Sequence, residues 1–119
     1  MTIIVTGWLP EPDIRNHQAI GKLAEEAIEL AGICARILIQ GLEHSNPSND
    51  EANRAALRKE MSDVCAAMTF AMGVTKEAPM PARVNEKLES YKRWFELINA
   101  GDVEAESYAD ATTEFQGII

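Results

Sequence analysis

Two pairs of acidic residues stand three positions apart within otherwise apolar stretches of this sequence. Glu26 and Glu29 lie in KLAEEAIEL, and Glu60 and Asp63 lie in RKEMSDV. Residues three apart in an α-helix point from nearly the same side, so two such helices packed together would bring four carboxylates into one pocket. Buried carboxylates require a counter-charge, and an all-oxygen set suits Mg²⁺, with Mn²⁺ as a substitute, rather than a soft metal. We therefore predict a divalent-cation site formed by these four residues.

The second pair has the stronger support from its own surroundings. At about 100° per residue, Glu60 and Asp63 fall within the apolar strip of their helix. No lysine or arginine stands between Glu60 and Met72, so local ion pairing does not explain these acids. Arg58 and Lys59 precede them and are expected to point elsewhere. The other members of the strip, all expected in the core, are Ala56, Ala67, Phe70 and Ala71.

The first pair borders an apolar stripe rather than lying inside it. Lys22 stands four residues before Glu26, where an ordinary surface ion pair can form. Glu25 is a spare acid beside the pair. It is our candidate catalytic residue, either as the general base for a water molecule or as a ligand of a second cation, and an exposed structural role stays open.

The elements that must position these acids are helices. Apolar residues recur at helical spacing over about 13–42, 50–72 and 82–99, with polar or proline-containing connections between them. Asp13 is the expected N-cap of the first helix, and a bend or break at Gly21 is an alternative. Ser48 and Glu51 have the spacing of a capping box for the second helix, and Gly73 is expected to close it.

The fold class that follows is all-α, an antiparallel bundle of four or so helices. A chain of 119 residues is expected to form one domain, 1–119, with its core at about 13–99. Residues 1–12 are predicted to form an arm and 100–119 a short last helix or tail, with strand alternation at most in 2–6.

Charge and cysteine content restrict the class of protein. The formal net charge of −8 disfavours stable binding to nucleic acid or to an anionic membrane. Cys34 and Cys65 lie within apolar helical patterns, which is typical of buried thiols in a reducing compartment, so we expect a cytoplasmic protein. The apolar N-terminal stretch is ten residues long and lacks a basic flank, so it is predicted to be neither a signal peptide nor a membrane span.

The two acidic motifs also carry a family resemblance. EExxE at 25–29 followed by ExxD at 60–63, in the context of KLAEEAIEL, RILIQGL and NRAALRKEMSDV, resembles the MazG-like all-α nucleoside triphosphate pyrophosphatases, including small members from phages and prophages. This superfamily includes dimeric dUTPases and dCTP pyrophosphatases. The resemblance covers about 14–98. The stretch 30–59 is longer than is usual in the superfamily, and a longer loop at 43–53 would absorb the difference.

The resemblance implies an enzyme. It suggests a Mg²⁺-dependent pyrophosphohydrolase that converts a nucleoside triphosphate, most plainly a dNTP, to the monophosphate and pyrophosphate, with metal ligands at Glu26, Glu29, Glu60 and Asp63. It also implies assembly into a homodimer or homotetramer. The apolar residues on most of the circumference of 61–72 favour assembly independently, because a chain of this size has few neighbours to cover them.

A triphosphate also needs cationic partners. Arg83, Lys87 and Tyr91 stand four apart along one edge of the third helix, and we predict that they contact phosphate or sugar, with Lys22 as a further phosphate ligand. Surface pairing of Lys87 and core packing of Tyr91 remain alternatives. The rival to an enzyme is a non-catalytic helical module that dimerises and binds a protein partner, in which the acids would be surface features. A nucleotide sensor that does not hydrolyse is a third possibility.

Overall fold

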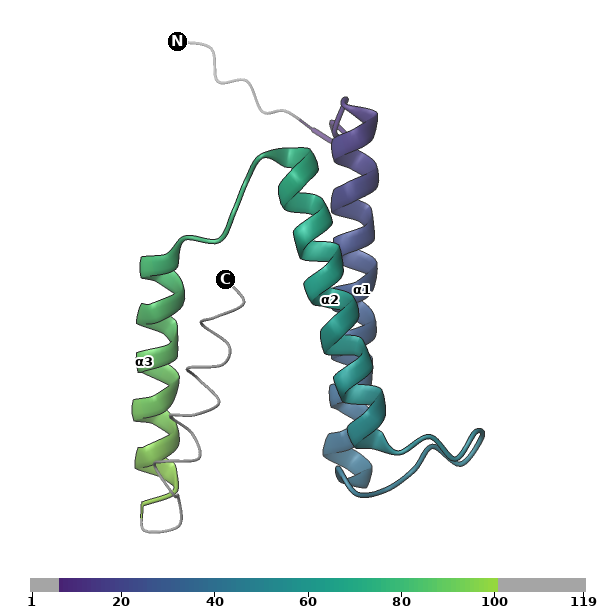
Figure 1. The fold of residues 1–119 in the computed structure, drawn as a ribbon, viewed down its shortest axis with the longest axis vertical. Helices are drawn as coiled ribbons and strands as arrows, with labels where there is room; N and C mark the ends of the chain where they lie inside the picture. The colour runs from purple at the N-terminus through teal and green to yellow at the C-terminus, as the bar shows by residue number, and fades with distance from the viewer. Residues whose placement is uncertain (1–6, 101–119) are drawn as a thin grey trace. The chain divides into compact units, whose positions relative to one another are not determined.

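The computed structural model describes residues 7–100, which form three helices (Figure 1). The chain divides into two compact units, Met1–Glu77 and Ala78–Ile119, and each is described by itself. Within the described residues the protein is all-helical, with a single isolated bridge between Ser45 and Ala52. The predicted short helix after residue 100 lies outside the described residues, as does the possible strand at 2–6. The helices are α1 (Ile14–Gln40), α2 (Asn53–Thr75) and α3 (Pro81–Ile98).

The first helix begins where the sequence predicts. The side chain of Asp13 accepts hydrogen bonds from the backbone N–H groups of Arg15, at 2.9 Å, and Asn16, at 3.2 Å, so it caps two donors that have no partner inside the helix. The helix continues through Gly21 without interruption, and the stretch is therefore one helix rather than two. It ends at Gly41, whose φ of 92° is a conformation that favours glycine.

The second helix begins later than predicted. Its N-cap is Ala52, which provides no side-chain hydrogen bond, so the predicted capping box is wrong. Ser48 instead donates from its hydroxyl to Oδ1 of Asn46, which keeps it within the loop. The start of α2 is held by Asn53, which is fully buried and donates from Nδ2 to the carbonyl oxygen of Gly41 at 2.9 Å. This bond ties the start of α2 to the end of α1.

The second helix also ends later than predicted, because Gly73 does not close it. The helix runs on to Thr75, and Lys76 takes the left-handed conformation that terminates it, with a φ of 65°. The backbone N–H of Lys76 donates to the carbonyl oxygen of Met72 at 3.0 Å. A non-glycine residue therefore supplies the C-cap, and Gly73 is an ordinary helical position.

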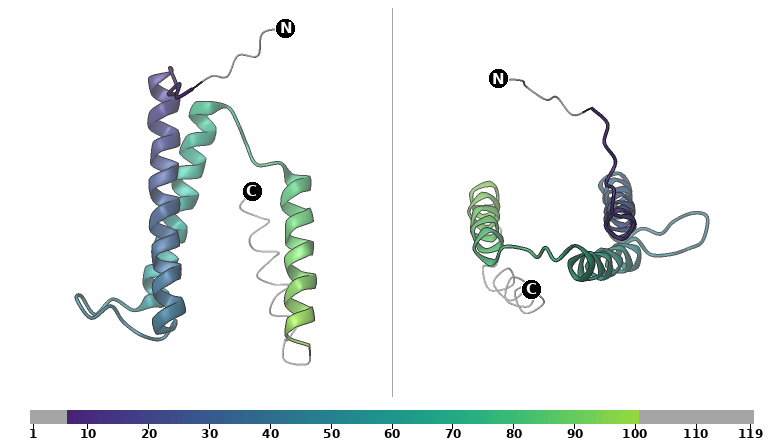
Figure 2. Two further views of the ribbon diagram at one scale, coloured as in Figure 1. Left: turned by 180° about the vertical axis from the view of Figure 1, so that it is seen from behind. Right: turned by 90° about the horizontal axis from the view of Figure 1, so that it is seen from above.

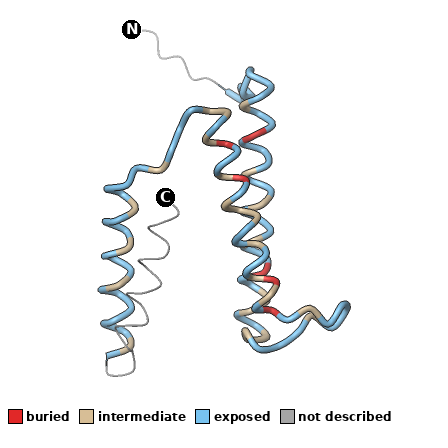
Figure 3. The backbone as a smooth tube through the Cα atoms, viewed as in Figure 1, coloured by how far each residue is buried: buried red, intermediate tan, exposed pale blue. Residues whose placement is uncertain are grey.

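The helices α1 and α2 pack side by side and run in opposite directions (Figures 1 and 2). Their buried residues lie where the two helices face each other (Figure 3). Most of these residues are alanines, and small side chains allow two helix backbones to approach closely. The buried apolar residues are Ala19 and Ile33 from α1, and Ala56, Ala67 and Ala71 from α2.

Two residues expected to be buried are not. Cys34 is exposed, because its neighbour Ile33 takes the position that faces α2. Phe70 is 53% exposed, because Ala67 and Ala71 occupy the line of contact with α1. Cys65, by contrast, is half-buried. The core predictions for Cys34 and Phe70 are therefore wrong for the unit that contains them.

The second unit contains α3, which begins with Pro81 at a position where proline costs the helix no hydrogen bond. None of its residues is buried. Nδ2 of Asn99 donates to the carbonyl oxygen of Phe95 at 3.0 Å, next to the end of the helix. Across both units, no described helix combines the length and the apolar character that a membrane span requires.

Candidate metal centre

The helices α1 and α2 bring together the two predicted acid pairs. One carboxylate oxygen from each of Glu26, Glu29, Glu60 and Asp63 lies within 4.8 Å of the others. Glu26, Glu60 and Asp63 are half-buried, and Glu29 is exposed. We call these residues the four-acid cluster. Its geometry follows from antiparallel packing, since each helix presents two acids one turn apart to the same stretch of its neighbour.

Two oxygens of the four-acid cluster lack the partners that buried polar atoms usually have. Oε2 of Glu26 and Oε2 of Glu60 are buried without a hydrogen bond to any residue the structure describes. Burial of a carboxylate without a donor costs free energy, and so does the proximity of four like charges. A ligand that supplies positive charge at this point would remove both costs.

The surroundings of Glu26 change the pKa of its carboxyl group. Its side chain is 14% exposed. Burial raises the pKa of Glu26 above its ordinary value, the negative charges of Glu29 and Asp63 raise it further, and the ammonium group of Lys22 opposes the shift. The charged form of Glu26 therefore carries an electrostatic penalty in the folded protein.

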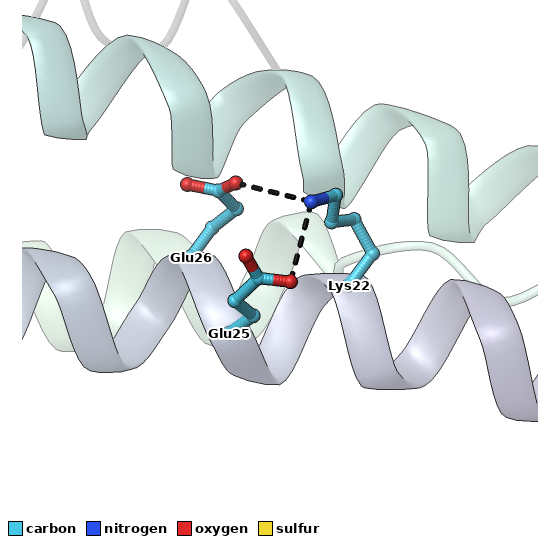
Figure 4. A network of polar contacts seen from close by, with 3 residues as sticks. All are labelled: Lys22, Glu25 and Glu26. Atoms are coloured by element: carbon cyan, nitrogen blue, oxygen red, sulfur yellow. Dashed lines mark hydrogen bonds and ion pairs between the residues drawn. The ribbon is translucent and has the colours of Figure 1, made fainter.

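Lys22 is a cation that lies beside Glu25 and beside Glu26 of the four-acid cluster (Figure 4). Its Nζ donates to Oε2 of Glu25 at 3.2 Å and lies 3.7 Å from Oε1 of Glu26. The hydrogen bond with Glu25 and the charge of that residue raise the pKa of Lys22. One ammonium group shared between two carboxylates cannot by itself neutralise a cluster of four, and among the described residues no other ion pair involves the cluster.

Glu25 lies outside the four-acid cluster. Its side chain is exposed and is paired with Lys22, one turn away on the same helix. This geometry favours the structural role that the sequence leaves open for Glu25, and its part in catalysis stays a prediction.

A pocket of about 290 Å³ adjoins the cluster at Glu29 and Glu60. We call it the Arg36 pocket, because Arg36 and Lys59 also line it, together with Glu51. Lys59 was expected to point away from the acids, and it borders the same pocket as Glu29 and Glu60. Arg36 was not singled out from the sequence, although it follows Glu29 by seven residues and so stands two turns along the same helix face.

A second pocket, of about 260 Å³, adjoins the cluster at Glu26 and Asp63. We call it the Phe70 pocket. It is lined also by Lys22, by the exposed Phe70 and by small apolar groups of α2 that include Ala66. The two pockets differ in character, since one contains two cations and the other contains an aromatic ring.

The other predicted substrate ligands belong to the second unit. Arg83, Lys87 and Tyr91 are all exposed on α3. Arg83 is paired with Glu86, with Nη1 and Oε1 3.4 Å apart. Their contacts with phosphate or sugar remain predictions.

Comparison of the sequence with models of known protein families, with curated proteins and with solved structures found no match. Function must therefore be argued from the residues and their geometry.

Proposed function

We propose that the protein is a Mg²⁺-dependent pyrophosphohydrolase that converts a nucleoside triphosphate, in particular a dNTP, to the monophosphate and pyrophosphate. The observation that carries the proposal is the four-acid cluster, which gathers carboxylates from two helices and leaves two buried oxygens without partners. The motif resemblance to MazG-like pyrophosphatases is consistent with it.

The residues present fit a divalent cation. Four carboxylates provide only hard oxygen ligands, which Mg²⁺ and Mn²⁺ prefer, and no histidine or cysteine belongs to the cluster. When bound, the cation would neutralise oxygens of the triphosphate and would orient the triphosphate for attack by water at its α-phosphorus. The reaction adds water across the bond between the α-phosphorus and the bridging oxygen, which leaves with the pyrophosphate.

The acids have distinct proposed parts. Glu26, Glu29, Glu60 and Asp63 hold the cation. Lys22 orients Glu26 through their 3.7 Å contact and lowers the repulsion within the cluster. The Phe70 pocket places an exposed aromatic ring beside Glu26 and Asp63, and aromatic rings stack on nucleobases. We assign the nucleoside to this pocket.

The proposal includes an antiparallel four-helix bundle in a cytoplasmic homodimer or homotetramer. The assembly into an oligomer is supported by large apolar side chains of the first unit that are exposed in the single chain, among them Ile28, Leu38 and Met61. Exposed apolar surface of this extent is typical of proteins that bind a partner.

The chemistry is tested by incubating the purified protein with each NTP and dNTP in the presence of Mg²⁺. The expected products are monophosphate and pyrophosphate, and in ¹⁸O-labelled water the label should enter the monophosphate. Release of inorganic phosphate alone, or label in the pyrophosphate, would contradict attack at the α-phosphorus.

A second candidate is a non-catalytic helical interaction module. The same exposed apolar side chains favour it, since they suit a protein partner equally well. Under this alternative Mn²⁺ does not raise the melting temperature and no nucleotide is hydrolysed. Stabilisation by Mn²⁺ and nucleotide without any product would instead indicate a nucleotide sensor.

A further inference from the structure

The Arg36 pocket contains a cation that forms no ion pair with any residue the structure describes. Arg36 is half-buried, and its Nε is buried without a hydrogen-bond partner in the described part of the chain. A buried guanidinium nitrogen without an acceptor costs free energy that an acceptor from a ligand would recover. The planar guanidinium group suits phosphate oxygens, which it binds through two parallel hydrogen bonds.

Lys59 provides a second cation in the same pocket. Its side chain is exposed, and within residues 7–100 neither Lys59 nor Arg36 forms an ion pair. Arg54, a neighbouring cation on α2, is by contrast paired with Glu43. The two cations of the Arg36 pocket are therefore available to a ligand.

The charge of the pocket depends on the four-acid cluster. The pocket is lined by three carboxylates, of Glu29, Glu51 and Glu60, and by two cations, so its lining carries one net negative charge. A divalent cation bound at Glu29 and Glu60 would reverse that sign. Anion binding here is therefore coupled to metal binding, and the coupling is reciprocal.

We propose that Arg36 and Lys59 form an anion subsite that holds the pyrophosphate portion of the substrate, with the α-phosphorus at the four-acid cluster and the nucleoside in the Phe70 pocket. This inference rests on the proposed function for the identity of the ligand. It gives the substrate a direction along the groove between α1 and α2, because the two pockets adjoin opposite members of the cluster. It assigns the contacts with the pyrophosphate portion to residues of the first unit.

The test is the binding of inorganic pyrophosphate, measured by calorimetry at a fixed total concentration of Mg²⁺. The subsite predicts that Arg36→Gln weakens binding by at least about tenfold, the cost of one lost hydrogen bond to a charged group. Lys59→Gln should weaken it by about threefold, since this side chain is exposed. Removal of Mg²⁺ should weaken pyrophosphate binding to the wild-type protein more than either substitution.

The matched controls are Arg15→Gln, on the same helix as Arg36, and Arg58→Gln, next to Lys59. Both remove an exposed positive charge outside the pocket, and we expect each to change the affinity by less than about twofold. Circular dichroism verifies that each variant is helical. If Arg36→Gln does not fold, the pyrophosphate affinity of Lys59→Gln is the deciding measurement, because the side chain of Lys59 is exposed and forms no ion pair within residues 7–100.

Separate measurements distinguish failure of the subsite from failure of the proposed function. Equal pyrophosphate affinities in wild type, Arg36→Gln and Lys59→Gln, with Mn²⁺ binding and dNTP hydrolysis intact, would overturn the subsite alone. Arg36-dependent pyrophosphate binding without hydrolysis of any nucleotide would retain the subsite and remove the proposed function. Weakening by the control substitutions as strong as by Arg36→Gln would indicate a diffuse charge effect and would also overturn the subsite.

Discussion

Acidic residues occur on both α2 and α3, but the two helices use them differently. On α3, Glu86 is exposed and pairs with Arg83 one turn away, so its charge is compensated on its own helix. On α2, Glu60 and Asp63 are half-buried and meet two further acids from α1. One helix shows a solvated surface, and the other shows a concentration of like charge whose ion pairing among the described residues is limited to the contact of Lys22 with Glu26.

The difference teaches that acid spacing on one helix does not define a site. Glu86 and Glu89 on α3 also stand three apart, as Glu60 and Asp63 do on α2. What distinguishes α2 is a second helix that presents matching acids, and one carboxylate oxygen of Glu60 and one of Glu26 are buried where the helices meet. A candidate metal centre therefore differs from an ordinary surface in two ways: acids from two helices meet, and their carboxylates are partly buried. The spacing of acids along one helix does not make this distinction.

The largest expected effect comes from removing one charge from the four-acid cluster. Glu60→Gln and Asp63→Asn should each lower Mg²⁺-dependent dNTP turnover by at least about a hundredfold, more than the loss of an outer-shell group costs a metal site. Glu89→Gln on α3 is the matched control and should keep wild-type turnover. Full activity in either cluster variant, with helicity retained, would remove the distinction between the two helices.

The next effect is on thermal stability. Mn²⁺ at a hundred times its dissociation constant should stabilise the wild-type protein by about 2.7 kcal/mol, which corresponds to roughly 10 °C in melting temperature for a small domain. Glu60→Gln should lose this increase, and Glu89→Gln should keep it. Melting curves recorded with Mn²⁺ and with EDTA provide the comparison, and an equal rise in all three proteins would indicate nonspecific binding.

Protonation of Glu26 is expected to have a smaller effect on the stability of the folded protein. The effect should have opposite signs in the metal-free and the metal-bound protein. Because the pKa of Glu26 is raised in the folded protein, the folded state binds the proton more tightly than the unfolded state does. The metal-free protein should therefore gain stability as pH falls from the raised pKa toward the ordinary value, and should carry the full penalty above it. Stabilisation by Mn²⁺ should decrease over the same interval, because protons compete with the cation.

Glu26→Gln makes that prediction testable at one pH. At neutral pH the variant should melt at a higher temperature than wild type in EDTA, because it lacks the penalised charge. In Mn²⁺ it should melt at a lower temperature, because a ligand is missing. A change of the same sign in both conditions would mean that Glu26 acts through packing rather than through its charge.

The smallest effect on turnover is expected from substitution of Glu25. Its exposed pairing with Lys22 predicts that Glu25→Gln changes kcat by no more than about threefold. A loss of a hundredfold or more, with a changed pH profile of kcat, would instead identify Glu25 as the general base. The outcome decides whether the cluster has four functional acids or five.

Patterns local to one helix predicted much of the fold. The apolar periodicity and Asp13 located α1 closely, because a cap and a stripe are properties of neighbouring residues. The boundaries of α2 were less predictable. Its start depends on Asn53, which bonds to Gly41 across the loop, and its end depends on Lys76 adopting a conformation usually taken by glycine.

The candidate site was predictable in part for the same reason. The spacing of the acids located both pairs of the cluster, and the packing of α1 against α2 brings the two pairs together. Arg36 and Lys59 were missed because their position beside Glu29 and Glu60 depends on how α1 and α2 approach each other. The exposure of Phe70 was missed because two neighbouring alanines fill the line of contact.

The alanines between α1 and α2 have a consequence for which ion the cluster would accept. Ala56 and Ala67 lie one turn before Glu60 and one turn after Asp63, and both are buried. The separation of the two helix axes at the cluster is therefore fixed by methyl groups. Mg²⁺ binds oxygen at about 2.0–2.1 Å and Ca²⁺ at about 2.3–2.6 Å, so selection by ionic radius would depend on two residues that carry no charge and never touch the ion.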